Sequence, residues 1–218
     1  MKGIALVTCQ NNKLDEKLAS VFVREGFNVF VMGDKPMEGV TLLPSKPNEA
    51  AAALREITSK LDILLDTTDV CDPEDTFTVC DGLNGAVIER VYRQNVLRPM
   101  AVLKELIFLM DNSECKRLFY LTGSMASINE TRCVDHFGYT LSKAALHQFL
   151  QMTRNTLAPK GYTFRVFDPM AGEVSSEAAA ESAYNYIIRR RGTENHDPLR
   201  DDEDNLVFRD ALGRQHAW

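Results

Sequence analysis

The sequence predicts an α/β fold: one doubly wound, Rossmann-like domain over residues 1–218, with a parallel sheet of about six to seven strands. Short apolar runs of strand length alternate from end to end with longer segments whose apolar residues recur at helical spacing. Apolar residues make up 44% of the chain and charged residues 26%, which is ordinary for a globular protein. Right-handed crossovers should then put helices on both faces of the sheet.

The first strand–helix–strand unit sets the pattern. Residues 3–8 form a short apolar run, typical of a strand buried on both faces. Residues 14–25 have helical spacing and Gly26 is a suitable helix stop. Residues 28–32 read as a second strand, which ends at Gly33-Asp34. Two strands joined by a helix predict parallel pairing.

The same alternation continues to the end of the chain. Further strands are expected at 41–43, 62–66, 118–121, 162–167 and 206–209, and helices at 48–60, 86–111, 138–157 and 176–191. The basic run at 189–191 suits a helix C-terminus, where the helix dipole favours cations. The strand ends of such a sheet are where ligands bind.

Charge and composition narrow the function. The net charge of −6 does not suggest a nucleic-acid-binding surface. The N-terminus lacks the features of a signal peptide, and no apolar run approaches the ~20 residues of a membrane span. We therefore expect a cytoplasmic protein with no nucleic-acid or membrane partner.

The cysteines and the acidic loop favour no metal site. The five cysteines are scattered and odd in number, so free thiols are expected rather than disulfides or zinc ligands. The loop 67–82 carries Asp69, Asp72, Glu74 and Asp75. We interpret it as a solvated loop; a metal site is the alternative, although the spacing matches no calcium loop.

Tyr139 and Lys143 lie four residues apart at the start of the helix 138–157, so both side chains share one helical face. A nearby ammonium stabilises phenolate and should lower the tyrosine pKa, making Tyr139 a general acid or base near neutral pH. Tyr139 follows the fifth strand and so falls at the ligand-binding edge of the sheet.

Together these features resemble a short-chain dehydrogenase/reductase over nearly the whole chain. The motifs that carry the resemblance are Thr8 after the first strand, the turn 65–70, Asn95-Val96, the loop 121–128, Tyr139-x-x-x-Lys143 with Ser142 and Ala144-Ala145, and Asp168-Pro169. The loop 121–128 and the ending 208–213 with Trp218 are similar to the C-factor-like branch of that family.

The resemblance implies hydride transfer between a nicotinamide cofactor and a small carbonyl or alcohol. Tyr139 would exchange the hydroxyl proton, Lys143 would lower its pKa and hold the nicotinamide ribose, and Asn95 would position a water. The implied cofactor-binding residues are Thr8, Gln10, Lys13, Asp34, Thr67 and Lys143. A carboxylate at Asp34 favours NAD; NADP or no cofactor are the alternatives.

Three departures concern the cofactor and the catalytic serine. The glycines of the family's phosphate loop are replaced by Cys9, Lys13 and Asp15, which should crowd the pyrophosphate. The turn that usually reads Asn-Asn-Ala-Gly is Asp-Thr-Thr-Asp at 66–69. The serine position falls at Gly123; Ser124 is the expected substitute and Ser127 a weaker candidate.

A fourth departure lies near the substrate. The segment between Pro169 and the helix 176–191, which supplies a substrate lid in the family, is short. A short lid implies an open pocket or a large partner.

Three functions stay open on this evidence. The first is an oxidoreductase with an atypical cofactor loop and Tyr139 as general acid/base. The second is a catalytically silent scaffold or binding protein that has lost the cofactor. The third uses Tyr139 for non-redox proton transfer.

The helices also suggest an assembly. The helix 86–111 is apolar on more than one face, so a homodimer or homotetramer paired through it and the Tyr139 helix is expected. The alternative is that both faces are covered within one chain.

Overall fold

A computed structural model describes residues 2–8, 13–170, 172–189 and 205–218. Its strands form one sheet in the order β3-β2-β1-β4-β5-β6-β7-β8. All neighbours pair in parallel except β7 and β8. The strands are β1 (Ile4–Thr8), β2 (Asn28–Met32), β3 (Val40–Leu43), β4 (Ile63–Asp66), β5 (Arg117–Leu121), β6 (Thr163–Asp168), β7 (Phe208–Asp210) and β8 (Gln215–His216). The predicted doubly wound sheet is confirmed; the antiparallel β8 was not predicted.

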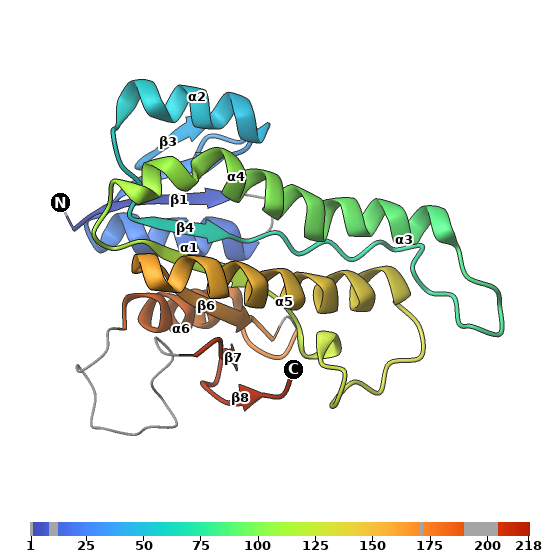
Figure 1. The fold of residues 1–218 in the computed structure, drawn as a ribbon. Coiled ribbons are helices and arrows are strands. Elements are labelled where there is room, and N and C mark those ends of the chain that lie inside the picture. Colours follow the sequence, from blue (N-terminus) through green and yellow to red (C-terminus); the bar gives the residue numbers. More distant parts are fainter. Residues whose placement is uncertain (1, 9–12, 171, 190–204) are drawn as a thin grey trace.

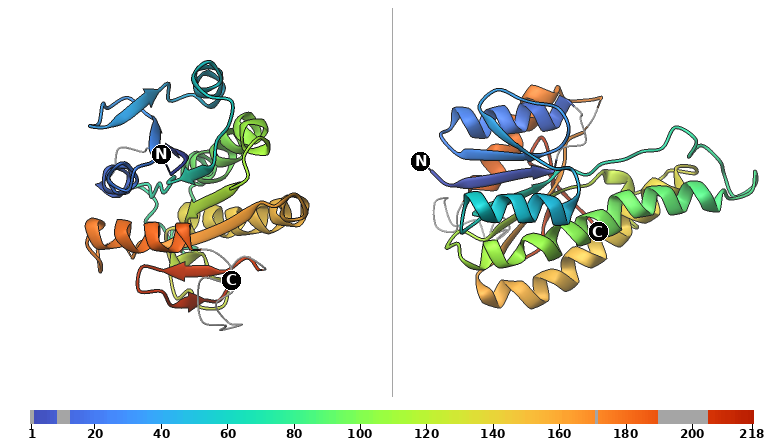
Figure 2. Two further views of the ribbon diagram at one scale, coloured as in Figure 1. Left: turned by 90° about the vertical axis from the view of Figure 1, so that its left-hand side faces the viewer. Right: turned by 90° about the horizontal axis from the view of Figure 1, so that it is seen from above.

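Helices cover both faces of the sheet (Figures 1 and 2). They are α1 (Lys13–Arg24), α2 (Pro47–Ile57), α3 (Gly85–Tyr92), α4 (Arg98–Asp111), α5 (Phe137–Leu157) and α6 (Ser176–Ile188), with the short turns η1 (Arg93–Leu97), η2 (Ser124–Ala126) and η3 (Ala158–Lys160). The predicted helix 48–60 ends early, at Ile57, and part of the predicted 176–191 helix lies outside the described residues.

The hydrophobic core has two layers, one on each side of the sheet. One layer packs α2, α4 and α5 against the sheet through residues such as Leu54, Leu106 and Leu150. The other packs α1 and α6 against the opposite face through Leu18, Phe22 and Ile187. Both faces of the central strands β1, β4 and β5 are therefore buried, which explains their apolar runs, whereas the edge strand β3 is partly exposed.

The predicted helix 86–111 is interrupted by a π-helical turn, Arg93–Leu97. The Arg98 N–H donates to the carbonyl of Arg93, five residues back. Pro99 explains the interruption, because proline has no N–H and its ring would clash with the carbonyl four residues before it, that of Asn95. The wider turn accommodates Pro99, and π turns of this kind often occur at functional sites.

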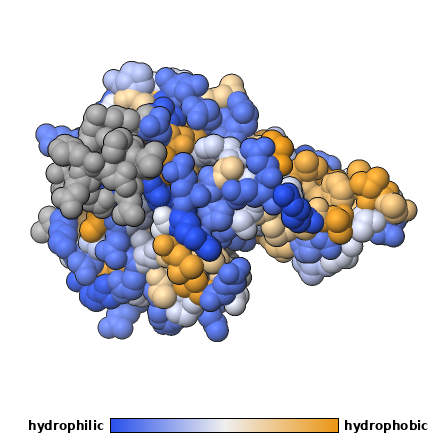
Figure 3. Space-filling model, turned by 90° about the horizontal axis from the view of Figure 1, so that it is seen from below, coloured by the Kyte–Doolittle hydropathy of each residue, from blue (hydrophilic) through white to orange (hydrophobic). Residues whose placement is uncertain are grey.

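The α3 helix and the first half of α5 project beyond the carboxyl edge of the sheet, and the loop 67–84 runs alongside (Figures 1 and 2). Gly138 lets the two helices approach, since a Cβ there would meet the Val91 Cβ at 3.2 Å. Figure 3 shows apolar side chains gathered on this arm, where Val79, Leu83 and Leu141 are exposed.

The sequence led us to expect a solvated acidic loop at 67–82, and the structure corrects this for Asp75. Asp75 is fully buried, and its carboxylate accepts hydrogen bonds from the Gly138 and Tyr139 N–H groups at 3.1 and 2.9 Å. It thereby caps the first turn of α5, where the helix dipole favours a negative charge. Asp72 and Glu74 instead pair with the half-exposed Arg90.

Two further expectations can be compared with the structure. None of the helices formed by the described residues has the length and apolar character needed to cross a bilayer. No disulfide joins any two of the described cysteines Cys71, Cys80, Cys115 and Cys133.

Candidate functional site

Three of the four predicted catalytic residues meet at the carboxyl edge of the sheet. Tyr139 and Lys143 lie on adjacent turns of α5, and Asn95 comes from the π-helical turn beside it. Asn95 and Lys143 are fully buried, and Tyr139 nearly so. The turn after β4 faces them, because Lys143 bonds to Thr68 and Tyr139 to Asp69.

Asp69 joins Tyr139 to Lys143. One of its carboxylate oxygens accepts a hydrogen bond from the Tyr139 hydroxyl and an ion-pair contact from Lys143 Nζ, both at 2.9 Å. Lys143 Nζ also donates to the carbonyl oxygens of Thr68 at 2.7 Å and Leu121 at 3.1 Å. Lys143 Nζ therefore makes two hydrogen bonds to backbone carbonyls and an ion pair with Asp69.

The Tyr139 pKa is shifted in the direction opposite to the sequence prediction. Burial, the charge of Asp69 and its hydrogen bond raise the pKa of Tyr139 well above its ordinary value of 10, in that order of importance. Lys143 Nζ lies 5.7 Å from the centre of the tyrosine ring. The expected lowering fails because burial disfavours the phenolate and Asp69 adds a negative charge beside the hydroxyl, so Tyr139 stays protonated at neutral pH.

Asn95 is held by the backbone of Val70. Its side-chain oxygen accepts from the Val70 N–H and its amide donates to the Val70 carbonyl, both at 2.9 Å. The amide also donates to the Ser142 hydroxyl at 3.0 Å. Asn95 therefore links the acidic turn to α5, and these contacts compete with any water it would position.

Gly123 faces the Tyr139 hydroxyl. A Cβ at position 123 would lie 2.7 Å from the hydroxyl oxygen, closer than real Cβ contacts. The tyrosine hydroxyl thus takes space that a serine side chain would need. Ser124, the predicted substitute, is exposed, and its N–H donates to Asp168. Ser127 is buried, and its hydroxyl accepts from the Glu130 N–H.

The predicted cofactor residues divide into a buried pair and an exposed pair. Thr8 and Thr67 are buried and bond to each other, the Thr8 hydroxyl accepting from the Thr67 N–H and the Thr67 hydroxyl donating to the Thr8 carbonyl. Lys13, which begins α1, and Asp34, which follows β2, are both exposed. Gln10 and Cys9 lie outside the described residues.

The described residues do not fit a nicotinamide dinucleotide as they stand. Lys143 Nζ is held by two backbone carbonyls and the Asp69 carboxylate, and the Tyr139 hydroxyl donates to Asp69. Asp69 occupies the place of the last glycine in the family's turn, so a side chain stands where the family has none. Asp15, which replaces another family glycine, is a fully buried carboxylate in the first turn of α1.

His147, one turn after Lys143, was not identified from the sequence. Its Nε2 lies 2.5 Å from the Thr122 hydroxyl, and its ring meets the Trp218 ring edge-on at 4.7 Å. Burial, followed by the charge of Lys143, lowers the pKa of His147 from 6.5 to about 3. The imidazole is therefore neutral at physiological pH and adds no positive charge beside Lys143.

Comparison with known proteins defines the class of fold. No family model and no curated protein matches the sequence. Solved structures match over the whole chain. The carbonyl reductase Sniffer of D. melanogaster has a TM-score of 0.84 at 13% identity and covers 100% of both chains. A carbonyl reductase from Pseudomonas aeruginosa PAO1 in complex with NADP has a TM-score of 0.78 at 16% identity, covering 99% of this chain and 100% of that one.

The chain therefore has the Rossmann-like fold found in short-chain dehydrogenases and carbonyl reductases. At these identities the likeness concerns the fold, and the site must be judged on its own residues. The helical spacing predicted that Tyr139 and Lys143 are neighbours, and the family resemblance implied a role for Asn95 beside them. Neither predicted the bridging role of Asp69, although the two extra carboxylates in the turn after β4 were a visible signal.

Proposed function

We propose that this chain is a catalytically silent relative of the short-chain reductases, a binding or scaffold protein that keeps the fold without using a nicotinamide cofactor. The observation that carries the proposal is the Asp69 carboxylate shared by Tyr139 and Lys143 at 2.9 Å each. This carboxylate engages both the Tyr139 hydroxyl and the Lys143 ammonium, which hydride-transfer chemistry would need for the substrate and the cofactor.

Two further observations support the same conclusion. The raised pKa of Tyr139 leaves its hydroxyl a poor proton donor at neutral pH. The residue that faces this hydroxyl is Gly123, so the expected position of the catalytic serine carries no hydroxyl group. Tyr139 and Gly123 lie outside both core layers, so changes at these positions can alter the chemistry of the site without altering the fold.

The second candidate is an oxidoreductase of the C-factor-like branch, with Tyr139 as general acid/base and a carbonyl or alcohol substrate. It is favoured by the assembly of Asn95, Tyr139 and Lys143 around one point. In that case Asp69 would have to leave Lys143, which would then bind the nicotinamide ribose. The cofactor supplies the hydride when bound, and the exposed Asp34 favours NAD over NADP.

A cofactor titration separates the two candidates. If the protein is catalytically silent, titration with NADH or NADPH up to millimolar concentration should give no saturable change in fluorescence. Saturable binding, together with carbonyl reduction that is lost in Tyr139→Phe, would establish the oxidoreductase. The triple variant Asp69→Gly, Gly123→Ser, Asp15→Gly returns three family residues and should bind more cofactor than the native chain.

The short segment between β6 and α6 and the exposed apolar side chains Leu97, Leu141 and Met152 support a protein partner, and we propose a homodimer or homotetramer through α4 and α5. The burial of Leu103 and Leu106 shows that one face of α4 is already covered within the chain. Light scattering at micromolar concentration tests the assembly, and a monomer would refute it.

A further inference from the structure

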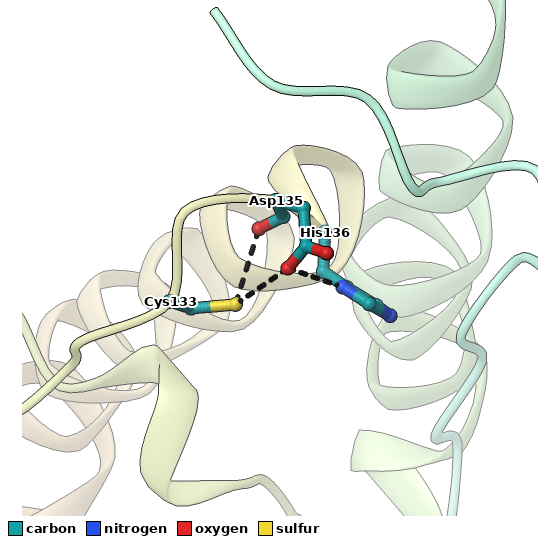
Figure 4. A group of neighbouring side chains, drawn as sticks. All are labelled: Cys133, Asp135 and His136. Carbon is teal, nitrogen blue, oxygen red and sulfur yellow. Dashed lines mark hydrogen bonds and ion pairs between the residues drawn. The ribbon is translucent and has the colours of Figure 1, made fainter.

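Three side chains with different metal-binding chemistry meet in the loop before α5: Cys133, Asp135 and His136 (Figure 4). The Cys133 Sγ lies 3.1 Å from Asp135 Oδ1, and the His136 Nδ1 lies 2.8 Å from the same oxygen. One potential ligand atom from each residue lies within 4.8 Å of the other two, and all three residues are half-buried. The atoms are close enough that small side-chain shifts would bring all three into a single coordination sphere.

The surrounding structure holds this convergence in place. His136 has a left-handed backbone conformation, with φ of 56°, which turns the chain into α5. Its N–H donates to the carbonyl of Asp75 at 3.0 Å, so the loop is fastened to a distant segment. The carboxylate of Asp75 takes the first N–H groups of α5 and offsets the positive end of the helix dipole, which would otherwise disfavour a cation here.

The ligand set selects the kind of ion. Magnesium and calcium prefer oxygen ligands alone, whereas a thiolate, an imidazole and a carboxylate together suit zinc. We propose that Cys133, Asp135 and His136 form a zinc site with three protein ligands and a fourth position open to water. This proposal departs from the sequence analysis, which assigned no metal, and it does not depend on the proposed function.

The hydrogen bonds around Asp135 show which protons zinc binding would have to move. Without metal, the Cys133 thiol donates to the Asp135 carboxylate, and the imidazole Nδ1 contacts the same oxygen. Zinc would displace the thiol proton to solvent, and the imidazole would carry its proton on Nε2 and bind through Nδ1. Binding should therefore release one proton and weaken at low pH.

Cys71 is the thiol that could complicate this assignment. It is exposed, and its pKa is raised first by partial burial, then by nearby aspartates and last by Cys133, so the two thiols lie within electrostatic range. It is not a member of the compact group. The variant Cys71→Ser therefore tests whether three protein ligands suffice.

The experiment is a zinc titration of the full chain against a chromophoric chelator, with a phosphine reductant to keep thiols reduced. One equivalent of zinc should bind per chain. Cys133→Ser and His136→Asn should each weaken binding at least about tenfold, since each removes a direct ligand. Asparagine suits position 136 because it tolerates the left-handed backbone.

A second readout and two controls make the outcome decisive. Cobalt in place of zinc should give a thiolate-to-metal absorption band that disappears in Cys133→Ser. Circular dichroism and urea unfolding must show that the variants fold. Cys80→Ser, an exposed thiol elsewhere, and Cys71→Ser should keep native affinity. Equal loss in Cys80→Ser, tenfold loss in Cys71→Ser, or native affinity in both ligand variants would overturn the proposal.

Discussion

Replacing Asp69 by asparagine tests the central feature of the site. The change keeps the size of the side chain and one acceptor oxygen but removes the charge that faces Lys143 at 2.9 Å. Lys143 is fully buried, whereas the Asp69 side chain is 23% exposed. Breaking a buried ion pair by removing one partner costs about 3–5 kcal/mol.

The structure places the expected cost below that range. Asp69 is partly hydrated, and asparagine still accepts a hydrogen bond from Lys143 or Tyr139, so we expect a loss of about 2–3 kcal/mol in the free energy of unfolding at pH 7. Urea unfolding measures it. Glu89→Gln is the control, because Glu89 pairs with Arg93 on the surface, with side chains 64% and 65% exposed, and its loss should cost at most about 1 kcal/mol.

A double-mutant cycle identifies the cause. Lys143→Met removes the buried charge, so Asp69→Asn should cost much less in that background, with a coupling of about 2 kcal/mol. If Asp69→Asn costs no more than Glu89→Gln in the native background, the carboxylate does not hold the lysine and the reasoning about the site is wrong.

Three further predictions concern neighbouring residues. Gly123→Ser should lower the free energy of unfolding by about 1–3 kcal/mol because its Cβ would lie 2.7 Å from the Tyr139 hydroxyl. In the control Gly85→Ser, a Cβ would meet open space, so the free energy of urea unfolding should change by less than about 0.5 kcal/mol. Equal effects of the two substitutions would contradict this prediction. The pKa of His147 is lowered to about 3, so between pH 6.5 and pH 5 only the unfolded chain binds a proton at this residue. The free energy of unfolding should therefore fall by about 2 kcal/mol as the pH drops from 6.5 to 5, and His147→Gln should abolish this part of the pH dependence. Asp75→Asn should cost about 1.5–3 kcal/mol by weakening the charged cap of α5, and an unchanged unfolding midpoint would show that the cap is dispensable.

The sequence predicted those parts of the molecule that local pattern controls. Strands β1, β2 and β5 and helices α1 and α5 lie within one or two residues of their predicted bounds, because apolar periodicity and Gly26 mark them directly. The meeting of Tyr139 and Lys143 follows from helical spacing alone.

Other parts depend on contacts between distant segments, which a local pattern does not contain. The direction of the Asp69 side chain depends on how the loop 67–84 runs along the projecting arm, and so does the burial of Asp75. The raised pKa of Tyr139 follows from that loop and not from the helix that carries it. The π-helical turn had a local signal in Pro99, which the apolar pattern across 86–111 concealed.

The π-helical turn also links the length of the chain to the presence of Pro99. The turn holds one residue more than an α-helical turn, so a single deletion between Arg93 and Leu97 could return the segment to α-helical spacing with the buried faces of α3 and α4 still aligned. The regular helix would then set the ring of Pro99 against the carbonyl four residues before it. The one-residue deletion should therefore fold well only when Pro99 is replaced as well, for example by alanine.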